Sequence, residues 1–150
     1  HFAANNQELN RSHNNSRVSE RALREIYLKG FAICARQAQP AAVMTSYNLI
    51  NGIHTSESRS LIMDFLRSEN QFKGIVMTDW VVRIPFGEGK HRYRNADAGQ
   101  VALAGGELFM PGSQADHNTI SKALAEGTIS RRQLEENASR LLSLIRKLTD

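Results

Sequence analysis

The chain has 150 residues, about the size of one domain, and 41% of them are hydrophobic, a share typical of globular proteins. Its 19 Lys and Arg residues against 15 Asp and Glu residues give a net charge of +4, too mild and too dispersed to indicate a nucleic-acid-binding protein. No apolar run is long enough to span a membrane, and the single cysteine, Cys34, excludes an internal disulfide.

The chain opens on a short apolar segment, residues 1–4, that runs into an amide-rich stretch over residues 5–10. It has neither an initiator Met nor a signal-peptide pattern, so we expect it to begin inside a structural element. Amides together with Arg11 offer planar donors and acceptors suited to vicinal hydroxyls. A solvated loop is the alternative, and composition alone favours it.

Helical and apolar segments then alternate along the chain. Ser19 is an expected N-cap of a helix that presents one apolar face, formed by Leu23, Ile26, Tyr27, Phe31 and Cys34. Further helices are predicted over residues 58–69, near 98–103, near 120–124 with Gly127 at their end, and after a Ser130-x-x-Gln133 capping box. Short apolar runs predict strands over residues 41–47, 74–80 and 106–112, and the first two lack the alternation of a half-buried strand, as expected of parallel strands covered on both faces.

The strands end at Tyr47, Asp79 and about Met110, intervals of 32 and 31 residues, the length of one βα unit. An open doubly wound sheet and a closed (β/α)8 barrel both fit this pattern, and both carry their chemistry at the carboxyl ends of the strands. No glycine-rich nucleotide-binding loop is present, and a barrel needs about 250 residues. The chain has room for about four βα units with parallel strands, a partial TIM-type barrel.

Asp79 is the strongest candidate for chemistry, because its carboxylate follows an apolar strand and an aromatic residue, Trp80, stands beside it. A helix cap or a structural carboxylate is the alternative. Tyr47 ends the preceding strand and offers a hydroxyl for a carboxylate or a sugar, or else is a packed aromatic residue. The histidines show no metal-binding spacing, so we expect neither a metal nor a cofactor. A basic loop over residues 81–94 is interpreted as solvated.

Taken together, these segments resemble glycoside hydrolase family 3, which includes β-glucosidases and β-N-acetylhexosaminidases. The resemblance spans nearly the whole chain. The segments that carry it are, in order, His1-Phe2-Ala3-Ala4-Asn5-Asn6-Gln7-Glu8, the helix after Ser19, Val43-Met44-Thr45-Ser46-Tyr47-Asn48, Gly74-Ile75-Val76-Met77-Thr78-Asp79-Trp80, and Met110-Pro111-Gly112.

The resemblance implies a role for each matching residue. Asp79 would be the nucleophile of a retaining glycosidase, forming a glycosyl ester that water hydrolyses. His1, Arg11 and Tyr47 would line the subsite for the non-reducing sugar, and Trp80 would help to wall the cleft. The substrate would be a small β-linked glucoside or a related sugar.

The chain departs from the family pattern at several points. The family's pocket Lys would precede His1, and nothing matches its acid/base residue. Gly106-Glu107 stands where the family tends to have Asn-Asp. We therefore expect residues 1–150 to be the C-terminal half of a family 3 barrel domain, inactive alone. Its expected partner is the missing N-terminal half with an acid/base-bearing domain, or a second copy in a homodimer, because unpaired strand edges associate. A non-catalytic carbohydrate-binding or structural module is the alternative, and an anion or nucleic-acid binder using residues 83–94 is a weaker one.

Overall fold

The computed structural model describes residues 1–82, 93 and 95–149. Most of the basic loop over residues 81–94 therefore lies outside the described residues, and so does the anion-binding alternative that depends on it. No described helix combines the length and the apolar character that crossing a membrane requires.

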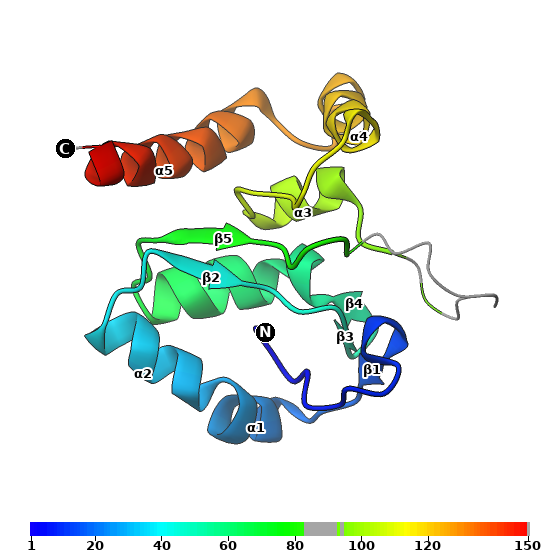
Figure 1. Cartoon of the computed structure of the whole chain (residues 1–150), viewed down its shortest axis with the longest axis vertical. Coiled ribbons are helices and arrows are strands. Elements are labelled where there is room, and N and C mark those ends of the chain that lie inside the picture. Colours follow the sequence, from blue (N-terminus) through cyan, green and yellow to red (C-terminus); the bar gives the residue numbers. More distant parts are fainter. Residues whose placement is uncertain (83–92, 94, 150) are drawn as a thin grey trace.

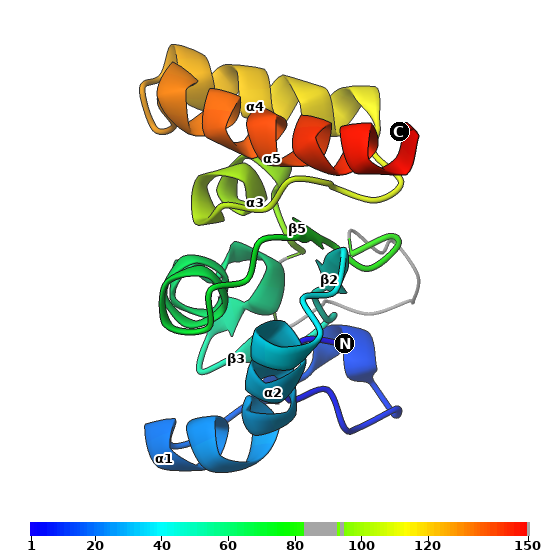
Figure 2. The same cartoon turned by 90° about the vertical axis from the view of Figure 1, so that its left-hand side faces the viewer.

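A row of parallel strand segments forms the centre of the molecule. Strand β2 (Ala42–Met44) pairs in parallel with β5 (Ile75–Met77), and single parallel bridges add Phe2 beside Thr45 and Leu108 beside Met77. Four segments that follow one another in the sequence thus lie side by side in the same order, as consecutive βα units require. The helices succeed one another from α1 at one end of the molecule to α4 and α5 at the other (Figures 1 and 2).

All three predicted strands are shorter than expected, and the segment over residues 106–112 contributes only the bridge at Leu108. Side chains explain this, because they replace backbone partners on both sides of the bridge. The Val76 N–H donates to the Glu107 carboxylate at 2.6 Å, and the Met110 N–H donates to Thr78 Oγ1 at 2.8 Å. The ladder of backbone hydrogen bonds is therefore interrupted after one residue.

The helices occupy the positions that the sequence predicts. They are α1 (Glu20–Ala22), a π-helical stretch (Leu23–Tyr27), α2 (Lys29–Gln37), a second π-helical stretch (Ser60–Glu69), α3 (Ala98–Ala104), α4 (Gln114–Ala125) and α5 (Arg131–Thr149), with short 3₁₀ turns at Arg11–His13 and Thr55–Glu57. Ser19 caps the first of them, accepting a hydrogen bond from the Ala22 N–H at 3.2 Å. The capping box is half formed, since Ser130 Oγ accepts from the Gln133 N–H while the Gln133 amide donates to Asn137.

The predicted apolar face of the first helix is partly wrong. Ile26 is 68% exposed and Cys34 is exposed, whereas Leu28 and Ala35 are buried. The π-helical turn before Leu28 explains the change, because a π turn holds one residue more than an α turn and shifts the buried face of the helix that follows by one position.

A second sheet, of three short strands, is not predicted by the sequence. Strand β3 (Leu49–Ile50) lies between β1 (Asn15–Ser16), to which it is parallel, and β4 (Ile53–His54), to which it is antiparallel. Asn51 and Gly52 form the turn between β3 and β4, and both residues have the positive φ, 50° and 91°, that a two-residue hairpin needs. This sheet anchors the segment after His1 beside the end of β2.

A buried ion cluster links the segment that contains Glu107 to two helical elements. The Glu107 side chain is fully buried and lies 2.7 Å from Arg67 Nη2, in the second π-helical stretch, and it also pairs with Arg140 of α5. Burial lowers the pKa of the Arg67 guanidinium, and the nearby Glu107 charge opposes that effect. The two cations and the backbone N–H compensate the free-energy cost of removing the Glu107 carboxylate from water.

We expect Glu107→Gln to destabilise the chain by about 3 kcal/mol or more, because it removes one member of a buried ion cluster and leaves two guanidinium groups without their counter-charge. Urea unfolding followed by circular dichroism measures this loss. Glu135→Gln is the matched control, since its pair with Arg131 is exposed to solvent and contributes little to stability. Equal losses in the two variants would contradict the structural role of Glu107.

Candidate active site

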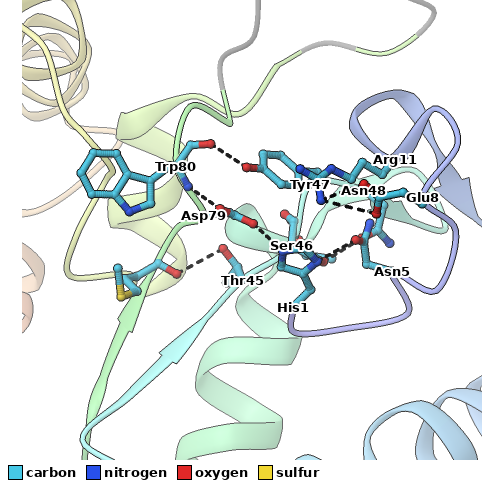
Figure 3. A network of polar contacts seen from close by, with 12 residues as sticks. His1, Asn5, Glu8, Arg11, Thr45, Ser46, Tyr47, Asn48, Asp79 and Trp80 are labelled. Atoms are coloured by element: carbon cyan, nitrogen blue, oxygen red, sulfur yellow. Dashed lines mark hydrogen bonds and ion pairs between the residues drawn. The ribbon is translucent and has the colours of Figure 1, made fainter.

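The carboxylate of Asp79 lies two residues beyond the end of β5, at the carboxyl end of the parallel strands. The residue is only 7% exposed. Its Oδ1 accepts a hydrogen bond from the Trp80 N–H at 2.6 Å, and its Oδ2 lies 2.6 Å from Nε2 of His1 (Figure 3). Oδ1 of the carboxylate is thus hydrogen-bonded, whereas Oδ2 makes an ion-pair contact with His1 and no hydrogen bond within the described residues.

His1 reaches Asp79 because its neighbour Phe2 joins the strand row. The Phe2 N–H donates to the Met44 carbonyl at 3.0 Å, and the Phe2 carbonyl accepts from the Ser46 N–H at 3.1 Å. The fully buried Phe2 side chain packs in the main apolar core. This pairing brings the first residue of the chain next to a residue nearly eighty positions away.

Tyr47 closes the other side of the site. Its hydroxyl donates to the Trp80 carbonyl at 2.8 Å, and its ring meets the His1 ring edge-on at 5.6 Å between centroids. The pKa of Tyr47 is raised to about 12, first by burial and then by the nearby Asp79 carboxylate, with the Arg11 charge opposing. The phenol therefore stays protonated at neutral pH and can donate.

Arg11 and Trp80 form the outer part of the site. The Arg11 guanidinium lies 5.0 Å from the centroid of the Tyr47 ring and 3.2 Å from Glu8. Within the described residues it therefore contacts Tyr47, a neighbour of the site, and forms its ion pair with Glu8. Trp80 is 53% exposed, which leaves an aromatic surface beside the carboxylate. The structure thus brings together all five residues that the resemblance singled out.

Two amide side chains that the sequence left without a role support the site. The Asn48 amide is fully buried and donates to the carbonyls of Ala3 and Ala4 at 3.3 and 3.2 Å, while its carbonyl oxygen accepts from Ser46. Asn5 Oδ1 lies 2.9 Å from Nδ1 of His1. For Asn5 the amide-rich composition of residues 5–10 was the signal, although composition cannot tell which of those amides turns inward.

Within the described ranges, no group of three or more His, Cys, Asp or Glu side chains is placed to hold a metal ion. The arrangement instead offers a held carboxylate, an imidazole, a protonated phenol and an exposed indole. These are groups for nucleophilic chemistry and hydrogen bonding at a polyhydroxylated, partly apolar ligand.

We expect Asp79→Asn to lower the pKa of Tyr47 from about 12 toward its ordinary value of 10, because the charge of the carboxylate is removed. An ultraviolet titration of the phenolate, referenced to Tyr47→Phe, measures this change. Because the folded state holds the Tyr47 proton more tightly than the unfolded state does, the wild-type chain should lose stability as the pH rises from about 10 to about 12. Asp64→Asn, at an exposed carboxylate, is the control, and an unchanged Tyr47 titration in Asp79→Asn would contradict the described contact.

The family model for the glycosyl hydrolase family 3 N-terminal domain matches residues 1–144 of the chain. Among curated relatives, an exo-alpha-(1->6)-L-arabinopyranosidase of Bifidobacterium breve is 41% identical over 98% of this chain and 18% of its own length. A beta-glucosidase of Ruminococcus albus is 41% identical over 97% of this chain and 15% of its own length. The chain thus spans less than a fifth of the length of these relatives.

Solved structures agree with this result. Beta-glucosidase 3B from Thermotoga neapolitana, in complex with glycerol, has a TM-score of 0.84 and 37% identity and covers 97% of this chain and 20% of its own. A family 3 beta-glucosidase of Bifidobacterium adolescentis has a TM-score of 0.82 and 39% identity and covers 98% of this chain and 20% of its own. The fold is accordingly an α/β fold that resembles the N-terminal TIM-barrel domain of this family, and the chain belongs to glycosyl hydrolase family 3, a family of glycoside hydrolases.

Proposed function

We propose that this chain carries the nucleophile of a retaining glycosidase acting on β-linked glucosides or closely related sugars, and that the nucleophile is Asp79. The observation that carries the proposal is the position of the Asp79 carboxylate at the carboxyl end of a parallel strand, with Oδ1 hydrogen-bonded by the Trp80 N–H and Oδ2 2.6 Å from Nε2 of His1. Active sites of barrel enzymes lie at that end of the strands.

The proposed reaction begins with attack of the Asp79 carboxylate on the anomeric carbon. The bond from that carbon to the glycosidic oxygen breaks, the leaving oxygen takes a proton from a general acid, and a glycosyl ester remains on Asp79. Water, deprotonated by the same second group, then attacks the anomeric carbon and restores the carboxylate with the configuration retained. In this step Asp79 acts as the carboxylate that attacks.

His1, Tyr47 and Arg11 are proposed to bind the sugar, and Trp80 to form an apolar wall of the cleft. Imidazole, phenol and guanidinium groups supply hydrogen-bond donors for ring hydroxyls, and the exposed indole offers a face for the apolar side of a pyranose. The relatives include both a beta-glucosidase and an arabinopyranosidase, so the proposed substrate class is a pyranoside. Turnover of aryl glucosides and aryl arabinopyranosides measures which sugar is preferred.

The proposal also assigns part of the machinery to polypeptide beyond these 150 residues. Within the described residues Asp79 contacts His1 and the Trp80 N–H, and neither of these is a carboxylic acid. We propose that residues 1–150 are half of a (β/α)8 barrel, and that the other half and an acid/base-bearing segment complete the site. The four parallel segments in chain order support this arrangement.

In the full-length protein, Asp79→Asn should lower kcat on an aryl β-glucoside by about 10³-fold or more, because the amide cannot form the glycosyl ester. Asp64→Asn, on the exposed side of a helix, should leave kcat unchanged. Wild-type-like turnover in Asp79→Asn would refute the nucleophile assignment. Binding of the sugar without turnover in the wild-type protein would favour the carbohydrate-binding module instead.

The 150-residue chain alone should give no measurable hydrolysis of the same aryl glucoside, since it has a nucleophile without an acid/base partner. Steady-state assays of the isolated chain, with its fold checked by circular dichroism, test this expectation. Turnover by the isolated chain that Asp79→Asn abolishes would show that the acid/base group lies within it.

A further inference from the structure

The turn between β3 and β4 consists of an asparagine followed by a glycine, Asn51-Gly52, and both residues are exposed. An asparagine in this position is open to attack on its side-chain amide by the backbone nitrogen of the next residue. Glycine favours that attack, because it has no Cβ to shield its nitrogen. The three strands around the turn lie together at one end of the molecule (Figure 1). The turn therefore combines the residue types and the exposure that spontaneous deamidation requires.

The side chain of Asn51 is nevertheless held by two hydrogen bonds to a single residue. Its Oδ1 accepts from the Val18 N–H at 3.0 Å, and its Nδ2 donates to the Val18 carbonyl at 2.8 Å. The Asn51 N–H donates to the Ser16 carbonyl at 3.1 Å, as part of the parallel ladder between β1 and β3. The next bond of such a ladder would join the Val18 N–H to the Asn51 carbonyl, and here the Asn51 side chain accepts it instead.

The nitrogen that would attack is bonded as well. The Gly52 N–H donates to Oδ1 of Asn15 at 2.9 Å. Asn15 and Val18 belong to one short stretch, residues 15–18, which we call the covering segment. The covering segment thus binds both reacting groups of a deamidation, the amide of Asn51 and the nitrogen that follows it.

We propose that Asn51 is a deamidation site and that the covering segment controls its rate in the folded protein. The Gly52 nitrogen loses its proton to water and attacks Asn51 Cγ, forming a five-membered succinimide. The bond from Cγ to Nδ2 breaks, and the nitrogen takes up a proton and leaves as ammonia. Water then adds to one of the two succinimide carbonyls and yields aspartate or isoaspartate. Both reacting groups must first be released, Gly52 by Asn15 and the Asn51 amide by Val18.

Deamidation would in turn weaken the attachment of the covering segment to the turn. A carboxylate only accepts hydrogen bonds, so an aspartate at position 51 loses the bond to the Val18 carbonyl and places a negative oxygen near it. Isoaspartate in addition lengthens the main chain of the turn by one carbon. The covering segment also supports the start of the chain, because Ser16 Oγ donates to the Ala4 carbonyl at 2.8 Å, three residues after His1.

A comparison of the folded full-length protein with a synthetic peptide of residues 47–57 tests the proposal. Both are incubated at mildly alkaline pH, and conversion of Asn51 is followed by mass spectrometry of the peptide that contains it. The synthetic peptide lacks the covering segment, so its Asn51 should convert about 10-fold faster or more, since release in the protein breaks three hydrogen bonds. Equal rates would overturn the proposal, and so would a synthetic peptide that keeps its Asn51 intact.

A variant of the covering segment tests its control directly. In full-length Asn15→Ala the Gly52 N–H loses its acceptor, so Asn51 should convert about 5-fold faster than in the wild-type protein, the factor expected for one hydrogen bond. Asn118→Ala, at an exposed asparagine of α4, should keep the wild-type rate. A wild-type rate in a folded Asn15→Ala protein would overturn the proposal. If Asn15→Ala does not fold, the comparison of the wild-type protein with the synthetic peptide decides.

Discussion

The pairing of Phe2 with the end of β2 is the constraint on which the candidate site depends. Two backbone hydrogen bonds, from Phe2 N–H to Met44 and from Ser46 N–H to the Phe2 carbonyl, add the first segment of the chain to the parallel row. Burial of the Phe2 ring in the core stabilises this position, because it removes a large apolar surface from contact with water. This pairing is what places His1 beside Asp79.

Polar groups beneath the site complete the arrangement. Parallel strands place their carboxyl ends at one edge, but the side chains there still need fixed backbone around them. The buried Asn48 amide supplies this support by binding the carbonyls that follow His1, and Thr78 receives the Met110 N–H beyond Asp79. Each buried polar atom that is satisfied in this way is also a constraint on position, because leaving it unpaired costs about 1–3 kcal/mol.

The sequence allowed the strands, the helices and the site residues to be predicted to different degrees. Unbroken apolar runs located the strands of β2 and β5, because strands covered on both faces exclude polar residues. The positions of the helices followed from caps and periodicity. The site residues came from the resemblance to a family, since a lone Asp79 after an apolar strand fits a structural role equally well.

Other features depend on tertiary contacts that no local pattern records. The π-helical turn at Leu23–Tyr27 changed which residues of the next helix are buried, although the sequence there reads as an ordinary amphipathic helix. Strands of two residues, such as β1 and β3, are too short to show alternation. Likewise, Glu107 reads as a surface carboxylate until Arg67 and Arg140 are brought to it from distant helices.

The most direct measurement of the central claim is to identify the residue that becomes glycosylated during turnover. The full-length protein, treated with an activated 2-fluoro-glucoside that forms a slowly hydrolysed ester and then digested, would be analysed by tandem mass spectrometry. The account predicts one sugar on the peptide containing Asp79, attached to that carboxylate and absent in Asp79→Asn. A sugar attached to any other carboxylate, with Asp79 unmodified, would contradict it.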